Sequence, residues 1–145
     1  MNLAEIREQF VDIDFDVTTF TVDQQKMIDW AVACGETEPR FVDPSHDDFQ
    51  AHPTFMAQYS STRLLPKDFP EIGDGRGVDG GKSIETFAPV RPGDTLTGHA
   101  QVHDVYDKTG RSGTMVFIVH RMIFENQHGD HVSTVDWRMI RPIGN

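Results

Sequence analysis

The stretch that decides the fold is residues 95–141, which read TLTGHAQVHDVYDKTGRSGTMVFIVHRMIFENQHGDHVSTVDWRMIR. It holds three runs rich in Val, Ile, Thr and Phe, and turns that contain glycine separate them at 108–113 and 127–130. β-branched and aromatic residues favour strands, and short turns bring consecutive strands into antiparallel pairing. The sequence therefore predicts an antiparallel meander with strands at 95–106, 114–126 and 131–141.

The middle strand of this meander is apolar on both of its faces. Met115, Phe117 and Val119 point to one side, and Val116 and Ile118 point to the other. A strand that is buried on both sides needs cover on both sides, and one amphipathic helix covers only one. The second cover must come from a long loop region or from another chain. Since exposed edge strands also favour pairing, we expect a dimer.

Upstream of the meander the pattern becomes helical. Apolar residues recur at helical spacing and stop at Gly35, which predicts a helix over 23–34. The other expected elements are a short helix at 3–10, a strand at 15–22, a short helix at 53–62 inside an irregular region at 35–82, and a strand at 82–87. One helix combined with antiparallel strands is an α+β architecture, and the length predicts one domain over residues 1–145.

The composition restricts the classes of partner. Hydrophobic residues make up 37% of the chain, which is enough for a packed core. The formal net charge is −10, which disfavours binding to a phosphate backbone, and the absence of a polybasic run disfavours an anionic membrane surface. We therefore expect neither a nucleic acid nor a membrane as partner.

The cysteine and histidine content argues against disulfides and metals. Cys34 is the only cysteine, so an intrachain disulfide is excluded and a reducing compartment is expected. The first ten residues lack the features of a signal peptide, so we expect a cytoplasmic protein. The histidine pairs at 99/103 and 128/131 have no convincing third ligand, and no metal is expected.

Several motifs together resemble the MaoC-like dehydratase/hydratase family, in particular its N-terminal-type dehydratase domain, which is similar to that of fatty acid synthase. They are ACGETEPRFVD at 33–43, FAPVRPGDTL at 87–96, VYDKTGRSG at 105–113, NQHGD at 126–130 and RMIRP at 138–142. The resemblance implies a hot-dog fold, in which a curved antiparallel sheet wraps around one long central helix. It also implies edge-to-edge pairing with a second hot-dog subunit and active sites at that interface.

The implied substrate is an acyl chain carried as a thioester on coenzyme A or acyl carrier protein, and no further cofactor is implied. The implied reaction is the reversible addition of water to a 2-enoyl thioester. The long region at 44–82 is expected to shape the acyl tunnel, so a bulky fatty or steroid acyl group is among the expected substrates.

The chain departs from the family pattern at both members of its acid/base pair. The family Asp falls at Glu36 and the family His falls at Phe41, whose ring transfers no proton. The resemblance therefore implies the accessory half of a heteromeric enoyl-CoA hydratase, which forms the acyl and coenzyme A tunnel beside a catalytic partner. Two alternatives stay open. One is a self-sufficient homodimeric hydratase or thioesterase that uses Glu36, and the other is a non-catalytic module that binds acyl-CoA.

Glu36 and His52 are the candidate catalytic residues. Glu36 retains a carboxylate at the end of the helix, and His52 replaces the lost imidazole if its loop folds back. The competing interpretations are a surface charge and an exposed loop histidine. The candidate residues for binding substrate or coenzyme A are Phe41, Pro53, Thr54, Asp79, Gly80, Lys108 and Arg111. Amides that open the short helix at Pro53 could face the thioester oxygen. The two cations of the hairpin turn could contact phosphates, whereas a bulge at the glycine and a solvated turn are the structural alternatives.

Overall fold

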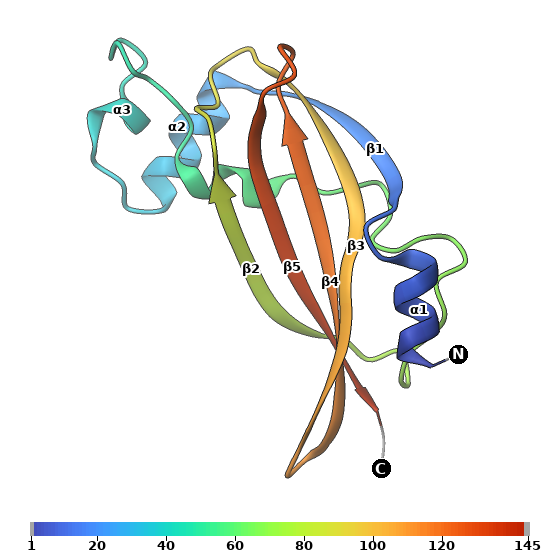
Figure 1. The fold of residues 1–145 in the computed structure, drawn as a ribbon. Coiled ribbons are helices and arrows are strands. Elements are labelled where there is room, and N and C mark those ends of the chain that lie inside the picture. The colour runs from blue at the N-terminus through green and yellow to red at the C-terminus, as the bar shows by residue number, and fades with distance from the viewer. Residues whose placement is uncertain (1, 144–145) are drawn as a thin grey trace.

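The computed structural model describes residues 2–143, which form one five-stranded antiparallel sheet with helices packed against it (Figure 1). The strand order is β1-β3-β4-β5-β2. The strands are β1 (Asp14–Thr21), β2 (Val78–Thr86), β3 (Thr95–Gly110), β4 (Gly113–Glu125) and β5 (His131–Ile143). The helices are α1 (Leu3–Phe10), α2 (Gln24–Ala33), α3 (Pro39–Val42) and the 3₁₀ helix η1 (Pro53–Gln58).

The predicted meander is confirmed and is longer than expected. β3 and β4 pair along their whole length and join in a tight turn that ends at Gly113, where a φ of 110° favours glycine. The short helix predicted at 53–62 is wrong in length and type, because η1 ends at Gln58. Helix α3 was not predicted, because four residues are too few for a periodic signal.

The curved sheet and the helix α2 confirm the predicted α+β hot-dog architecture, but two helices share the cover of the concave face. Helix α2 has ten residues, and its buried Met27 packs with η1 and with Phe124 of β4 at one end of the sheet. At the other end, Ile6 and Phe10 of α1 pack against β3 and β4 (Figure 1). Two separate hydrophobic clusters therefore fill the space between the concave face of the sheet and the segments that cover it.

The convex face of the sheet is covered only in part. Val116 and Ile118 of β4 are fully buried on the concave face, as predicted. On the convex face, Met115 and Phe117 stay half-buried, and the ring of Phe117 stacks on Tyr106 at 4.9 Å. On the same face Val119 is buried, so residues 2–143 supply only part of the predicted second cover, and pairing with another chain stays a prediction.

Strand β2 begins earlier than predicted. We expected it to begin at Lys82, with Asp79 and Gly80 in the preceding loop, and this was wrong because both lie inside β2. The pairing of β2 with β5 shifts between Asp79 and Lys82, so the glycines form a bulge in the ladder. A Cβ atom on Gly80 would lie 2.8 Å from the carbonyl oxygen of Arg138, so the strands leave no room for a side chain there.

We expect Gly80→Ala to destabilise the fold by about 1–3 kcal/mol, because the new methyl group forces the β2–β5 backbone apart. Denaturant unfolding of the two proteins measures this difference. Gly110→Ala is the matched control, since a Cβ atom there meets no atom within 4 Å. Equal losses for both variants would show that the close approach of Gly80 to Arg138 has no energetic effect.

A buried histidine makes stability depend on pH. His120 lies on the concave face of β4, and its Nε2 is 3.0 Å from the hydroxyl of Ser61. That hydroxyl donates to the carbonyl of Arg63 at 2.6 Å, so His120 donates its Nε2 hydrogen to Ser61. Burial is the main cause that lowers the pKa of His120 below its ordinary 6.5, and the charge of Lys82 acts in the same direction.

Because the pKa of His120 is lower in the folded chain, the unfolded chain binds the extra proton more readily. We therefore expect stability to fall as the pH drops below about 6.5, by at most about 1.4 kcal/mol per pH unit. Unfolding free energies measured between pH 7.5 and 5 test this. His120→Gln should flatten the slope, and His128→Gln, at an exposed position, should leave it unchanged. Parallel slopes for all three proteins would contradict the assignment to His120.

Candidate functional site

The candidate site begins where helix α2 ends. Asp23 caps the start of the helix by accepting the N–H of Lys26 at 2.9 Å. At the other end, Gly35 has a φ of 76°, and the N–H of Glu36 donates back to the carbonyl of Ala31 at 3.0 Å. This hydrogen bond at the glycine-terminated helix end positions the Glu36 backbone relative to α2.

The carboxylate of Glu36 is held by the backbone that follows it. Its Oε1 accepts the N–H of Glu38 at 2.8 Å and the N–H of Thr37 at 2.9 Å. These bonds hold the pKa of Glu36 below its ordinary value, the bond from Glu38 having the largest effect. Glu36 is therefore ionised at neutral pH, and its other oxygen, Oε2, is available for a second interaction.

The second interaction comes from His52. Its Nε2 lies 3.4 Å from Oε2 of Glu36, and the two side chains are only 19% and 24% exposed. The loop that carries His52 is anchored by the N–H of Ala51, which donates to Val90 at 2.8 Å, and by the N–H of Gln50, which donates to Arg40 at 2.9 Å. The structure thus brings together the two residues that the sequence singled out as catalytic candidates.

Phe41, which was expected at the position of the family His, lies directly beside this pair. Its ring is buried and meets the ring of His52 edge-on, with centroids 5.3 Å apart. The guanidinium of Arg40 lies over the Phe41 ring, 4.7 Å from its centroid. The imidazole of His52 therefore contacts the aromatic ring that lies at the position where an imidazole was expected.

Pro53 and Thr54 open η1, but their surroundings differ from the expectation. We expected free amides there for a thioester oxygen, and this was wrong for Thr54, whose N–H donates to Nδ1 of His52 at 3.3 Å. The N–H of Phe55 is also used, because it donates to the carbonyl of His52 at 2.8 Å. The start of η1 serves to hold the histidine.

The remaining binding candidates lie apart from the Glu36–His52 pair. Asp79 accepts the N–H of Gly81 and the indole N–H of Trp137, both at 2.8 Å, so its carboxylate stabilises the bulge. Lys108 and Arg111 are exposed at the β3–β4 turn, at the opposite end of the sheet from α2 (Figure 1). Within one chain the structure does not bring these two cations to the carboxylate.

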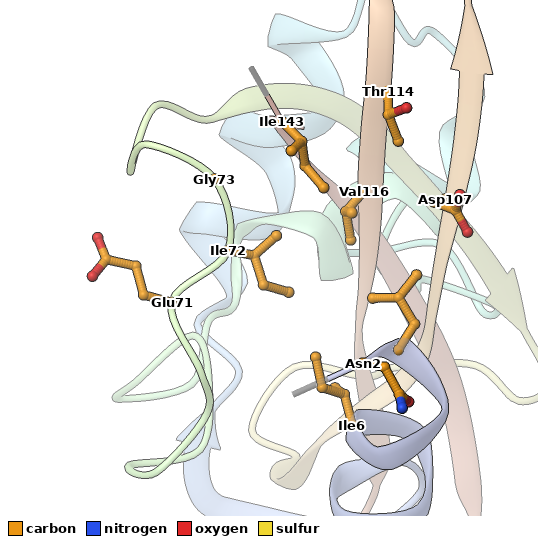
Figure 2. Close-up of a pocket in the computed structure, with 10 residues that line it drawn as sticks. Asn2, Ile6, Glu71, Ile72, Gly73, Asp107, Thr114, Val116 and Ile143 are labelled. Carbon is orange, nitrogen blue, oxygen red and sulfur yellow. The ribbon is translucent and has the colours of Figure 1, made fainter. Parts of the chain in front are cut away.

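A cavity that the sequence did not predict lies near the end of the sheet that carries the β3–β4 turn. Its volume is about 540 Å³, and it opens between α1, the segment at 71–73 and the β3–β4 hairpin. Figure 2 shows Ile72, Val116 and Ile143 around its centre, with Asp107 at one side. The described lining residues include two acids and no base, so this cavity does not suit the phosphates of coenzyme A.

Two features are missing from residues 2–143. No helix there is both long and apolar enough to span a membrane. No cluster of three potential ligands among His, Cys, Asp and Glu occurs in the same residues.

Comparisons with known proteins agree with this architecture. A family model described as the FAS1-like dehydratase domain region matches residues 9–135. A search of curated proteins gives no match.

Solved structures with the same fold include two that are named MaoC-like dehydratases. One from Rhodospirillum rubrum is 18% identical with a TM-score of 0.62, and the alignment covers 96% of this chain and 97% of that one. One from Phytophthora capsici is 22% identical with a TM-score of 0.68, covering 95% of this chain and 50% of that one. A chain of the ChsH1–ChsH2 complex from Mycobacterium tuberculosis is 18% identical with a TM-score of 0.66, covering 99% and 91%. At these identities the structures establish the shared fold.

Proposed function

Because this chain belongs to the FAS1-like dehydratase family, we propose that it adds water reversibly to a 2-enoyl thioester of coenzyme A or acyl carrier protein, with Glu36 and His52 as the reacting pair. Family membership supports hydro-lyase chemistry. The observation that carries the assignment to these residues is the 3.4 Å distance between Oε2 of Glu36 and Nε2 of His52. That distance is long for a direct hydrogen bond, so a water molecule can contact both atoms.

The reaction balances with one carboxylate. Glu36 accepts a proton from the water while the water oxygen bonds to C3 of the enoyl group, and the π electrons shift toward C2 and the thioester carbonyl. The protonated Glu36 then delivers that proton to C2, which restores the carboxylate. His52 holds the water oxygen in line with C3. The reverse sequence removes water from a 3-hydroxyacyl thioester.

The lowered pKa of Glu36 sets its protonation state before the reaction. A base must be ionised before it can accept a proton, and the amides of Glu38 and Thr37 keep this carboxylate ionised at neutral pH. Its conjugate acid is correspondingly strong, which favours return of the proton to the carbanion-like C2. The partial burial of both side chains limits competition from bulk water.

The direct experiment mixes the purified chain with 2-enoyl-CoA. Loss of the conjugated-enoyl absorbance, with a 3-hydroxyacyl-CoA product identified by mass, supports hydration. A thiol reagent in a parallel sample reports hydrolysis of the thioester. Release of free coenzyme A without any hydroxyacyl product would instead support a thioesterase that uses Glu36. If neither product forms with this chain, either alone or with a partner, the proposed chemistry is wrong.

A second candidate is the accessory half of a hydratase made of two different subunits. Two observations favour it: Phe41 stands where the family has its His, and one similar structure is of the ChsH1–ChsH2 complex. In this case activity should appear only after co-expression with a hot-dog subunit that has an intact Asp/His pair. Replacing Glu36 in this chain should then leave the activity of the complex unchanged, which distinguishes the two candidates.

A further inference from the structure

We propose that Thr54, itself held by Trp30, is a positioning residue that keeps the His52 ring in the tautomer with its hydrogen on Nε2 and directs this N–H at Glu36. The role in turnover rests on the proposed function, whereas the tautomer itself does not. It assigns to Thr54 a different task from the contact with substrate that the sequence predicted.

The hydrogen bonds of His52 define which ring nitrogen carries the proton. Nδ1 lies 2.7 Å from the hydroxyl oxygen of Thr54 and accepts the backbone N–H of the same residue at 3.3 Å. A backbone N–H can only donate, so Nδ1 must act as an acceptor. In a neutral imidazole one nitrogen accepts and the other donates, and the hydrogen is therefore on Nε2.

Trp30 supplies one of the hydrogen bonds of the Thr54 hydroxyl. The indole Nε1–H donates to Oγ1 of Thr54 at 3.0 Å, and an indole N–H is never an acceptor. The hydroxyl oxygen accepts from Trp30, and its own hydrogen can go to Nδ1 of His52 at 2.7 Å or to Sγ of Cys34 at 3.8 Å. The much shorter contact and the stronger acceptor favour Nδ1. A chain of donors runs from Trp30 through Thr54 to His52.

Packing holds this chain in place. The indole of Trp30 meets the buried ring of Phe55 edge-on, with centroids 6.2 Å apart and an angle of 88°. The imidazole of His52 is supported in the same way by Phe41. Trp30 is on helix α2, which also leads to Glu36, so one helix positions the carboxylate and, through Thr54, the imidazole that faces it.

The tautomer decides which member of the pair accepts the proton. With a hydrogen on Nε2, neutral His52 donates toward the carboxylate or toward a water that contacts both side chains, and it cannot act as a base at that atom. Glu36 is then the only proton acceptor of the pair. The Thr54 hydroxyl adds to the carboxylate and the backbone N–H in favouring this tautomer, so its loss should raise the share of the other tautomer, which presents a bare nitrogen to Glu36.

Three variants test the arrangement by long-range ¹H–¹⁵N NMR of the histidine rings and by steady-state kinetics. Thr54→Val removes the hydroxyl with little change of shape, Thr54→Ser retains it, and Trp30→Phe removes the indole donor together with part of the ring that packs on Phe55. We expect the wild type and Thr54→Ser to show a protonated Nε2 and an unprotonated Nδ1. Thr54→Val should show a mixture of tautomers and a kcat lower by about 10- to 100-fold, with KM changed by less than about threefold. Thr109→Val, at the exposed hairpin, is the control and should change neither readout.

Different results overturn the two proposals. A hydrogen on Nδ1 in the wild type contradicts the inference, even if the protein is an active hydratase. A hydrogen on Nε2 in a protein without hydratase activity leaves the tautomer assignment intact and contradicts the function. If Thr54→Val does not fold, Trp30→Phe gives the same tautomer test, and an unchanged tautomer and kcat in that variant would overturn the role of Trp30.

Discussion

Glu36→Gln is expected to lower the hydratase kcat by about 100- to 10,000-fold, the usual contribution of a positioned acid or base. The amide has the shape of the carboxylate and can still accept the N–H groups of Thr37 and Glu38 through its oxygen, so the fold should be retained. It cannot accept a proton from water. Because the bonds to these amides are independent of turnover, KM for the enoyl thioester should change much less than kcat.

Glu38→Gln is the matched control for this prediction. Its carboxylate lies two residues along the chain, pairs with Arg40 at 2.7 Å and is 49% exposed. We expect this variant to retain the activity of the wild type. A double variant of Glu36→Gln and His52→Gln should be little worse than Glu36→Gln alone, because the two residues act on the same water. Full activity of Glu36→Gln would refute the assignment of the reacting pair.

Phe124→Ala is expected to destabilise the fold by about 3–5 kcal/mol, the range for removal of a fully buried aromatic ring. Phe124 is on the concave face of β4 and has no exposed surface. Its ring contacts Phe20 of β1 and Tyr59 after η1, with centroid distances of 6.1 and 6.0 Å. Replacement by alanine would leave a cavity and remove the aromatic contacts between β4 and the segment that follows η1.

Denaturant unfolding at neutral pH measures this loss, which is a large fraction of the roughly 5–15 kcal/mol that stabilises an ordinary domain. Phe87→Ala is the control, because Phe87 is 53% exposed and stacks only on His131 at 4.3 Å. We expect the control to lose less than about 1 kcal/mol, as surface substitutions usually do. A similar loss for both phenylalanines would mean that the cluster under β4 does not carry the stability assigned to it.

Local sequence patterns were sufficient to predict most of the helices and strands. Helix α2 and the meander were predicted to within a few residues, because helical spacing, strand-forming runs and glycine turns are local signals. The start of β2 was missed, since Asp79-Gly80-Gly81 reads as a loop in the sequence. Only the pairing with β5 shows that these residues form a bulge inside a strand.

The candidate site was predictable in its residues but not in its geometry. Glu36 was predicted as a candidate because it follows a helix end that Gly35 marks in the sequence. The contact of His52 with Glu36 depends on how the irregular segment between them folds, and that path is set by bonds to Arg40 and Val90. The hydrogen bond of Trp30 to Thr54 could not be predicted from the sequence, because an aromatic residue on an amphipathic helix is usually interpreted as a core residue.

By itself, the sequence determined the α+β class, the meander and the helix that ends before Glu36, because each of these is encoded in neighbouring residues. The tertiary structure alone decided that His52 stands against Glu36, that Thr54 and Trp30 orient it, and that Lys108 and Arg111 lie at the far end of the sheet. The physical reason is that contacts between distant segments depend on how strands, loops and helices pack together, and no short window of sequence encodes that packing.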